Sequence, residues 1–313
     1  MIIDNDFAGD PDDLFQLAHH LLSPSVEIPF VIASRLPAAH RGEYIGTVEQ
    51  GVSVVGELLQ QMRMDLPILR GTEEDRTDSS PVRSEASDAI VAEALRDDTD
   101  LPLFVALGGG LTELANAYLT EPAIADRLTA VWIGGPPYVQ AETAEPTATG
   151  AEYNLSIDVP SAQVVFGSPI PLWQVPMDAY RRCLVSWTEL RRRVGDLGGF
   201  GAHMMSALDG FADLIFKYGI NLGSETYVLG DNPLVLLTAL QSAFDPDPNS
   251  SDSVMTPRMS ITDMGWYGAP QPQLPPVRVF TRPDTRLMFE DMFAKFASHA
   301  TKLGISVVDD DTE

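Results

Sequence analysis

The sequence predicts an α/β fold in which a mostly parallel central sheet is flanked by helices, with short antiparallel edge strands near the C-terminus. First, short apolar runs alternate with segments of helical periodicity over residues 1–175, and strands buried on both faces are typical of parallel sheets. Second, Asp-rich or Gly-rich turns follow several of these runs, where such sheets bind ligands. No repeat or linker divides the 313 residues, so we expect one domain, residues 1–313.

Each strand expected in the first half is a short apolar run that ends at a turn or a polar loop. These runs cover residues 2–3, 26–33, 66–69, 101–107, 128–133 and 170–175. The helices between them carry apolar residues three or four apart, as at Leu14, Leu17 and Leu21 before Pro24 ends the first helix. They cover residues 14–22, 43–64, 87–96, 112–119 and a segment from Pro160.

The second half is less regular. Helical periodicity covers residues 187–195, 203–218, 234–244 and 284–303. Two apolar segments, 254–264 and 277–281, have the pattern of strands, and we expect them to pair antiparallel at one edge of the sheet. Polar residues 72–85, 139–151 and 245–253 are expected to form loops.

Composition restricts the partners and the compartment. A formal net charge of −25 argues against binding to nucleic acid or to an anionic membrane. No apolar run is long enough to cross a bilayer, and no signal peptide is predicted. Cys183 is the only cysteine, which excludes an internal disulfide and fits a reducing compartment. We therefore expect a cytoplasmic protein.

Five aspartates lie directly after the first apolar run and before the first helical pattern. They are Asp4, Asp6, Asp10, Asp12 and Asp13. So many carboxylates in one turn repel one another unless a cation holds them. Capping of the helix explains one or two aspartates at its start, but not all of them. The sequence therefore predicts a divalent-metal site at this strand-to-helix junction.

Two general templates fit this stretch incompletely. An EF-hand loop that started at Asp4 would have Phe15 in its twelfth position, where a bidentate Glu is needed, so this template fails. A phosphatase of the Asp-x-Asp type would use Asp4 as nucleophile and Asp6 as acid. It gives the remaining aspartates no role, and it stays an alternative.

A third template covers much more of the chain. The stretch 4–14 resembles the longer variant of the N-terminal signature of the nucleoside hydrolase family, whose members include inosine-uridine preferring enzymes. Later segments resemble that family in the correct order, namely 65–71, 107–115, 134–135, 152–158 and 231–234. Each later motif is weak alone, but the ordered set is specific. The resemblance spans residues 2 to about 240 and implies a Rossmann-like sheet.

The resemblance also implies a set of metal ligands. Asp6, Asp13 and Asp231 would ligate Ca²⁺, and a backbone carbonyl near Gly108 would add another oxygen. Hard oxygen ligands of this kind suit Ca²⁺. Asp10 belongs to the insertion of the longer variant and has no counterpart, so we expect it to support the ligands from behind.

Further roles concern the substrate and the reaction. Asp12, Glu152 and Asn154 would bind the sugar hydroxyls, and Asp6 or Asp4 would remove the proton of the attacking water. Ser34 is a candidate substrate-binding residue after the second strand, where the family's Gly-Asn pair is replaced and its sugar-binding amide is missing. The aromatic ring of Trp266, or of its neighbour Tyr267, is a candidate for stacking on the base.

One departure bears on the leaving group. Family members that cleave inosine and uridine place a His just before the late Asp, and here that position is Gly230. Among the histidines, His19 and His20 are expected to pack within the first helix, and His40 is a weaker candidate for the site. The triple glycine that starts at Gly108 lacks the spacing of a phosphate-binding loop.

These observations together predict hydrolysis of the N-glycosidic bond of a ribonucleoside to ribose and free base. A metal-bound water would attack the sugar through an oxocarbenium-like transition state. The expected cofactor is Ca²⁺, the partner a small nucleoside or related riboside, and the assembly a homo-oligomer by analogy with the family. Two further alternatives are a hydrolase of another riboside on the same fold and a non-catalytic, calcium-stabilised sugar- or nucleoside-binding protein.

Overall fold

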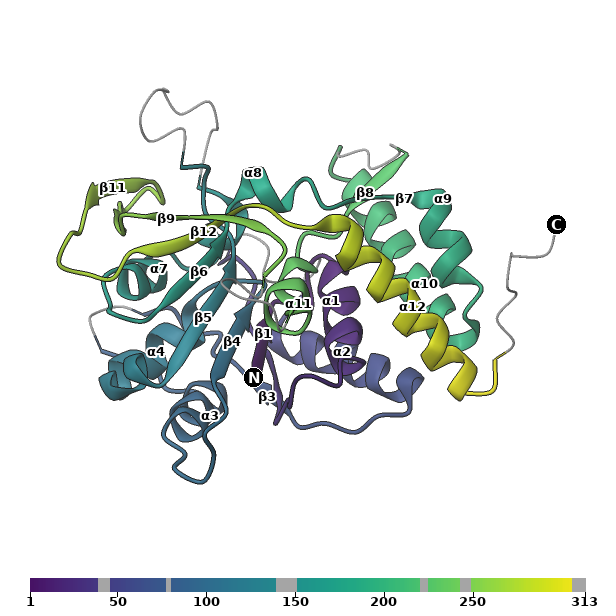
Figure 1. The fold of residues 1–313 in the computed structure, drawn as a ribbon, viewed down its shortest axis with the longest axis horizontal. Helices are drawn as coiled ribbons and strands as arrows, with labels where there is room; N and C mark the ends of the chain where they lie inside the picture. Colours follow the sequence, from purple (N-terminus) through teal and green to yellow (C-terminus); the bar gives the residue numbers. More distant parts are fainter. Residues whose placement is uncertain (39–45, 77–79, 139–150, 220–224, 243–248, 306–313) are drawn as a thin grey trace.

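An eight-stranded sheet runs through the centre of the molecule (Figure 1). The structure is a computed structural model that describes residues 1–38, 46–76, 80–138, 151–219, 225–242 and 249–305. The strand order is β3-β2-β1-β4-β5-β6-β12-β9, and within the described chain every pair is parallel except β12 with β9. The predicted parallel sheet with an antiparallel edge strand is confirmed. The strands are β1 (Ile2–Asn5), β2 (Val31–Ala33), β3 (Ile68–Arg70), β4 (Leu103–Leu107), β5 (Leu128–Ile133), β6 (Leu172–Val175), β9 (Asp252–Thr256) and β12 (Val277–Arg282).

Helices cover both faces of this sheet, as expected for parallel strands (Figure 1). One face packs against α3 (Glu85–Ala94), α4 (Thr112–Thr120) and α7 (Val159–Phe166). The other packs against α1 (Asp12–Leu21), α2 (Val48–Met62) and α11 (Pro233–Thr238), and α10 (Gly198–Phe216) and α12 (Thr285–Lys302) pack on these helices from outside. Short helices α6 (Tyr153–Ile157), α8 (Met177–Tyr180) and α9 (Trp187–Leu190), the 3-10 helix η2 (Pro122–Asp126) and a π-helical turn (Arg191–Gly195) complete the described helices.

The side chains of β1 alternate between these two layers. Ile2 belongs to the core beneath α3, α4 and α7, whereas Ile3 belongs to the core beneath α1, α2, α10 and α12. Because successive side chains point to opposite faces of a strand, Asp4 faces the α4 side and Asn5 faces the α1 side. This alternation decides which buried partners the two residues meet.

The largest differences from the predicted strand bounds occur at two strands. The strand expected at 26–33 is limited to β2, because Pro29 has no backbone N–H to give to a ladder. The strand expected at 254–264 divides into β9 and β10 (Met259–Ile261) around Pro257 and Arg258. The Arg258 side chain turns inward, where its guanidinium donates to backbone carbonyls including that of Ser168 at 2.9 Å.

The strands of the C-terminal half form more pairs than predicted. β12 pairs antiparallel with β9, as expected, but it also pairs in parallel with β6 and so belongs to the main sheet. β10 forms a separate antiparallel pair with β11 (Tyr267–Pro270), and β7 (Leu184–Ser186) pairs with β8 (Thr226–Val228). These strands are too short for their periodicity to be read from the sequence.

Several helix ends differ from the prediction. α2 begins at Val48, because Thr47 and Gln50 form a capping box there; residues 43–45 and His40 lie outside the described chain. α10 begins at Gly198, and the helix expected at 187–195 is α9 followed by the π-helical turn. α11 ends at Thr238, whose hydroxyl donates to the Leu234 carbonyl at 2.6 Å and competes with helical N–H groups. No described helix is both long and apolar enough to span a membrane.

Candidate functional site

The candidate site lies where the direction of the strand order reverses. From β1 the chain proceeds to β2 and β3 on one side of the sheet, and then returns to place β4, β5 and β6 on the other side. Ligands of open α/β sheets bind at such a switch point, outside the carboxyl ends of the strands. The aspartate loop follows β1 and Gly108 follows β4, so both lie at this point.

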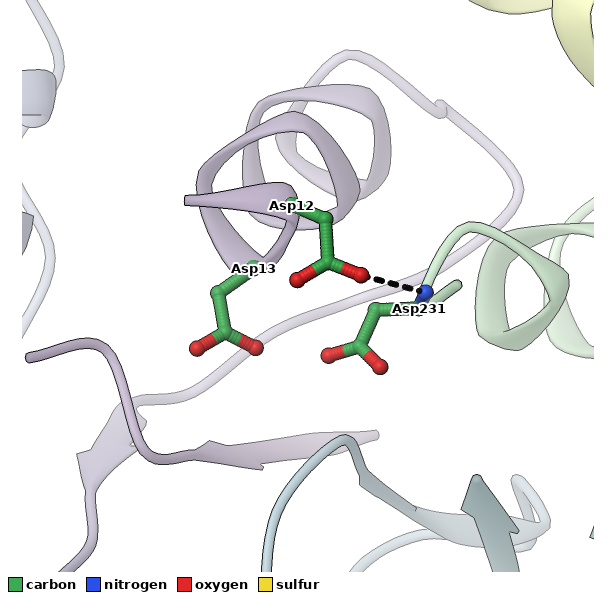
Figure 2. A group of neighbouring side chains, drawn as sticks. All are labelled: Asp12, Asp13 and Asp231. Atoms are coloured by element: carbon green, nitrogen blue, oxygen red, sulfur yellow. Dashed lines mark hydrogen bonds between the residues drawn. The ribbon is translucent and has the colours of Figure 1, made fainter. Parts of the chain in front are cut away.

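Three carboxylates from distant parts of the chain meet there. Asp12 and Asp13 start α1, and Asp231 lies just before α11 (Figure 2). Each offers one oxygen, and these three oxygens lie within 4.8 Å of one another, close enough to hold a metal ion. Asp12 also accepts a hydrogen bond from the backbone N–H of Asp231 at 3.2 Å, across 219 positions of sequence. The predicted convergence of Asp231 on the first loop is therefore present.

Asn5 lies at the centre of this group. Its side-chain NH₂ faces Asp13 Oδ1 at 2.8 Å and Asp231 Oδ2 at 3.2 Å. Its side-chain carbonyl accepts from the backbone N–H of Gly108 at 3.0 Å. A single neutral amide thus bridges β1, α1, β4 and the start of α11. It partly satisfies two carboxylates that would otherwise repel each other.

The Gly108 position must lack a side chain for this arrangement. A Cβ atom there would lie 2.0 Å from Asp231 Oδ2 and 2.7 Å from Asn5 Nδ2. The Gly108 carbonyl, which is the expected backbone ligand, accepts from Asn154 Nδ2 at 2.7 Å. Only glycine allows Asp231 to approach β4 so closely.

Asp6 and Asp4 are both buried at the end of β1 but have different surroundings. Asp6 lies beside Gly109, where a Cβ would be 2.7 Å from Asp6 Oδ1. It is outside the group formed by Asp12, Asp13 and Asp231. Asp4, on the α4 side of β1, has no hydrogen-bond partner among the described residues for either carboxylate oxygen. Its electrostatic neighbours include Glu113 and Asp6.

Burial dominates the electrostatics of this loop. Loss of solvation raises the pKa of Asp6, Asp12 and Asp13 well above the ordinary value, and repulsion by the neighbouring carboxylates adds to this. Burial likewise raises the pKa of Asp231 to about 7 and that of Asp10 to about 6. Packing these groups together without a cation is costly, so the donor set and its charge fit a hard divalent ion.

Asp10 lies beside the three carboxylates and contacts the chain around them. It accepts hydrogen bonds from the Tyr227 hydroxyl on β8 and, at 3.2 Å, from the backbone N–H of Asp12. It therefore holds the start of α1 against β8. This contact is consistent with the supporting role expected for the inserted residue.

Glu152 and Asn154 lie at the start of α6 and are already engaged within the chain. Glu152 Oε2 accepts from the backbone N–H groups of Gly135 at 2.7 Å and Leu155 at 3.0 Å. Its Oε1 accepts from the Tyr180 hydroxyl at 2.7 Å. Asn154 donates to the carbonyls of Gly108 and Ile133. Both residues therefore shape the turns beside the carboxylates.

Gly230 lies between the Asp12 carboxylate and the ring of Tyr180. A Cβ atom at Gly230 would lie 3.3 Å from Asp12 Oδ2 and 3.3 Å from Cδ2 of Tyr180. Burial, with the nearby Glu152 carboxylate, raises the pKa of Tyr180, so its hydroxyl keeps its proton. The position of the missing His is thus bordered by the Asp12 carboxylate and by the ring of a protonated phenol.

The remaining predicted site residues are Ser34, whose backbone N–H donates to the Asn5 carbonyl at 2.9 Å, and Trp266. Ser34, after β2, is buried, and its hydroxyl has no partner among the described residues. Trp266 lies half-buried in the turn between β10 and β11. The preceding Gly265 packs against Ala151, where an added Cβ would meet the Ala151 Cβ at 2.4 Å. The turn therefore borders the segment that carries Glu152.

The sequence reasoning assigned no role to several polar residues of the site. Asn5 was part of the aspartate stretch but had no function, and Gln16, Tyr180 and Tyr227 were not considered. One signal was available for Gln16, because Asp13, Gln16 and His20 have the spacing of one helix face. The tyrosines come from separate elements, and no local pattern marks them.

The fold and the site define an α/β protein with an acidic ligand-binding centre at the switch point of a parallel sheet. The model of the inosine-uridine preferring nucleoside hydrolase family matches residues 1–262. The chain belongs to this family, and it is an enzyme of the nucleoside N-ribohydrolase class.

Solved structures agree with this fold. The chain is similar to a purine-preferring ribonucleoside hydrolase from Gardnerella vaginalis, with 15% identity, 96% of this chain and 100% of that chain covered, and a TM-score of 0.75. An inosine-guanosine nucleoside hydrolase shares 18% identity, with 95% and 98% covered and a TM-score of 0.68. A Bacillus anthracis inosine-uridine preferring nucleoside hydrolase shares 14% identity over the same coverage, with a TM-score of 0.64. A search of curated proteins found no match.

Proposed function

We propose that this protein hydrolyses the N-glycosidic bond of a ribonucleoside in a Ca²⁺-dependent reaction. One observation carries the proposal: the carboxylates of Asp12 and Asp13 meet that of Asp231, which is 219 positions beyond Asp12 in the sequence. Family membership supports the reaction class, and the all-oxygen, multiply charged donor set supports a hard cation.

In this proposal the site residues have distinct tasks. Asp13 and Asp231 hold the cation together with Asp6, Asp12 contributes to it or binds a sugar hydroxyl, and the Gly108 carbonyl is a further oxygen donor. Asp6 removes the proton of the attacking water, and Asp4 supports the same loop. Glu152, Asn154 and Ser34 border the sugar, and Trp266 the base.

The chemistry follows from the charge of this centre. When bound, Ca²⁺ lowers the pKa of a coordinated water and orients it. The buried Asp6 carboxylate, beside Gly109 at the end of β1, would accept the proton of that water. The remaining negative charge stabilises the positive sugar ring that develops as the bond to the base breaks.

A second candidate function is favoured by Gly230. The chain has no His at this position, and the hydroxyl of the neighbouring Tyr180 donates its hydrogen bond to Glu152. At this position the described residues offer the departing base no strong acid, which favours a riboside whose leaving group departs easily. A protein that binds a nucleoside without cleaving it is the limiting case of the same observation.

Ribose release from a panel of purine and pyrimidine nucleosides tests the proposal. We expect release to stop in a chelator and to return with Ca²⁺. Asp13→Asn and Asp231→Asn should each lower kcat/KM on the order of 10²-fold or more, because the cation contributes several kcal/mol to transition-state stabilisation. Asp209→Asn is the matched control, since this carboxylate pairs with Arg191 at the surface.

Each alternative has its own outcome. Cleavage of other ribosides alone supports the related hydrolase, and saturable nucleoside binding without ribose release supports the binding protein. Ribose release that survives complete removal of divalent cations contradicts the calcium requirement. Cleavage of an aryl phosphate with Mg²⁺ would support the phosphatase alternative.

A further inference from the structure

A row of buried polar side chains lies directly behind the carboxylate group. Gln16 and His20 extend from α1 on the same face as Asp13, and Thr238 faces them from the end of α11. All three residues are buried, with 0% exposure for Gln16 and His20. Buried polar groups need partners, and here they partner one another.

The hydrogen bonds of this row run in one direction. The Thr238 hydroxyl donates to the Leu234 carbonyl at 2.6 Å, so its oxygen must accept from His20 Nε2 at 2.8 Å. His20 therefore carries its proton on Nε2, and its bare Nδ1 accepts from the NH₂ of Gln16. This leaves the Gln16 carbonyl to face Asn5 Nδ2 at 3.0 Å.

The direction of these hydrogen bonds matters because it fixes the orientation of the Gln16 amide toward Asn5. If that amide were rotated by 180°, its oxygen and NH₂ would change places. Its NH₂ would then face the NH₂ of Asn5, and one of the two amides would have to turn away. The two hydrogens of that same NH₂ group are shared among Asp13, Asp231 and the Gln16 carbonyl. An inverted Gln16 would therefore disturb the contact that bridges the two carboxylates.

We propose that Gln16, His20 and Thr238 are positioning residues, which hold the Asn5 amide between Asp13 and Asp231 and thereby set the spacing of these carboxylates for a cation. The chain of hydrogen bonds begins at Thr238, the last residue of α11, passes through His20 and Gln16 on α1, and reaches Asn5 at the end of β1. It thus couples the two elements that supply the ligands. The inference rests on the proposed function, because it concerns the same cation.

The surroundings of His20 agree with this assignment. Burial, together with the neighbouring His19, lowers the pKa of His20 well below its ordinary value, so the ring is neutral. A neutral ring has one donor and one acceptor nitrogen, which is what a one-way chain requires.

Calcium affinity measured by calorimetry on the purified full chain tests the inference without reference to turnover. His20→Leu removes both ring contacts and should weaken Ca²⁺ binding about tenfold, the usual effect of losing a group that orients a metal ligand. His20→Asn keeps an acceptor near the Nδ1 position but loses the contact with Thr238, so its loss should match that of Thr238→Val and stay within about threefold of the wild type. Thr238→Val, a milder change that removes the hydroxyl, should give an intermediate loss.

Leu17→Ala is the control for stability, because Leu17 is a fully buried residue of the same helix without polar atoms. It should lower the thermal midpoint in chelator and leave the Ca²⁺ affinity unchanged. Wild-type affinity in both His20→Leu and Thr238→Val overturns the inference, as does an equal loss of affinity in Leu17→Ala. So does His20→Asn binding as weakly as His20→Leu. These results leave the proposed function standing, whereas a wild type that binds no Ca²⁺ overturns both.

Discussion

At the scale of single residues, the site depends on where a side chain is absent. Gly108 ends β4 where Asp231 and Asn5 approach the backbone, and the space for a Cβ is already occupied. Two polar groups would have to move for a single methyl group. The residue therefore controls the distance between the late aspartate and the first loop, although it has no side-chain chemistry of its own.

Gly108→Ala should separate Asp231 from Asn5. We expect Ca²⁺ affinity to fall at least about tenfold, since the position of a ligand changes, and the free energy of unfolding to fall by about 1–3 kcal/mol through overpacking. Calcium calorimetry and chemical denaturation measure the two effects.

Gly210→Ala provides the comparison. An added Cβ at this position in α10 meets nothing within 4 Å, so alanine should stabilise the helix by roughly 0.5–1 kcal/mol. Unchanged calcium affinity in Gly108→Ala would show that the close approach of Asp231 is unimportant.

At the scale of elements, a buried ion pair connects the end of β2 to the start of α7. Arg35 Nη2 lies 2.9 Å from Asp158 Oδ2, and both side chains are only 3% exposed. Asp158 also caps α7 through the backbone N–H of Ser161 and accepts from the Thr112 hydroxyl. The ion pair therefore holds Arg35, and with it the neighbouring Ser34, against the start of α7.

Asp158→Asn keeps the capping oxygen and removes the charge. Arg35 then keeps the ion pair with Asp75, whose side chain is 65% exposed, and the longer-range attraction of Glu113. We expect the free energy of unfolding to fall by about 3 kcal/mol, as for other broken buried pairs. Equilibrium denaturation is the measurement.

Asp97→Asn removes the partner of Arg127 in an ion pair at the surface. Its effect should stay below about 1 kcal/mol, since water screens such pairs. If the two substitutions cost the same, the Arg35–Asp158 contact does not stabilise the fold.

At the scale of the whole molecule, the acidic centre links stability to pH and to cations. The folded chain raises the pKa of Asp10 to about 6 and of Asp231 to about 7, whereas an unfolded Asp titrates near 3.9. Between about pH 4 and pH 7 the unfolded chain has therefore released protons that the folded chain retains. Stability without cations must fall as pH rises through this window.

Thermal unfolding in chelator should accordingly show a falling midpoint between pH 5 and pH 7.5. Added Ca²⁺ should raise the midpoint most at pH 7.5, because the cation then replaces protons that are already lost. At a concentration of 100 times its Kd it should add about 2.7 kcal/mol.

Asp231→Asn should flatten the pH dependence, and so separates the site from the general repulsion of a chain with a net charge of −25. A midpoint in chelator that does not change over this range would contradict the electrostatic account of the site.

Local sequence patterns predicted the sheet and the ligand-binding loop. The parallel sheet follows from apolar runs such as Leu103–Leu107, which are buried on both faces. The ligand-binding loop follows from the density of aspartates after β1. Both are properties of neighbouring residues, and neighbouring residues keep their relation in any fold. The short strands β7 and β8 were missed because three residues are too few to define a period.

What the sequence by itself determined is the family, the sheet and the acidic first loop, because each depends on spacing along the chain. Only the tertiary structure decided that Asp12 joins Asp13 and Asp231, that Asp6 lies outside this group, and that Asn5 bridges it. The physical reason is distance: Asp12 and Asp231 are 219 positions apart. The packing of α11 against α1 and the sheet sets their separation, and no local period encodes that packing.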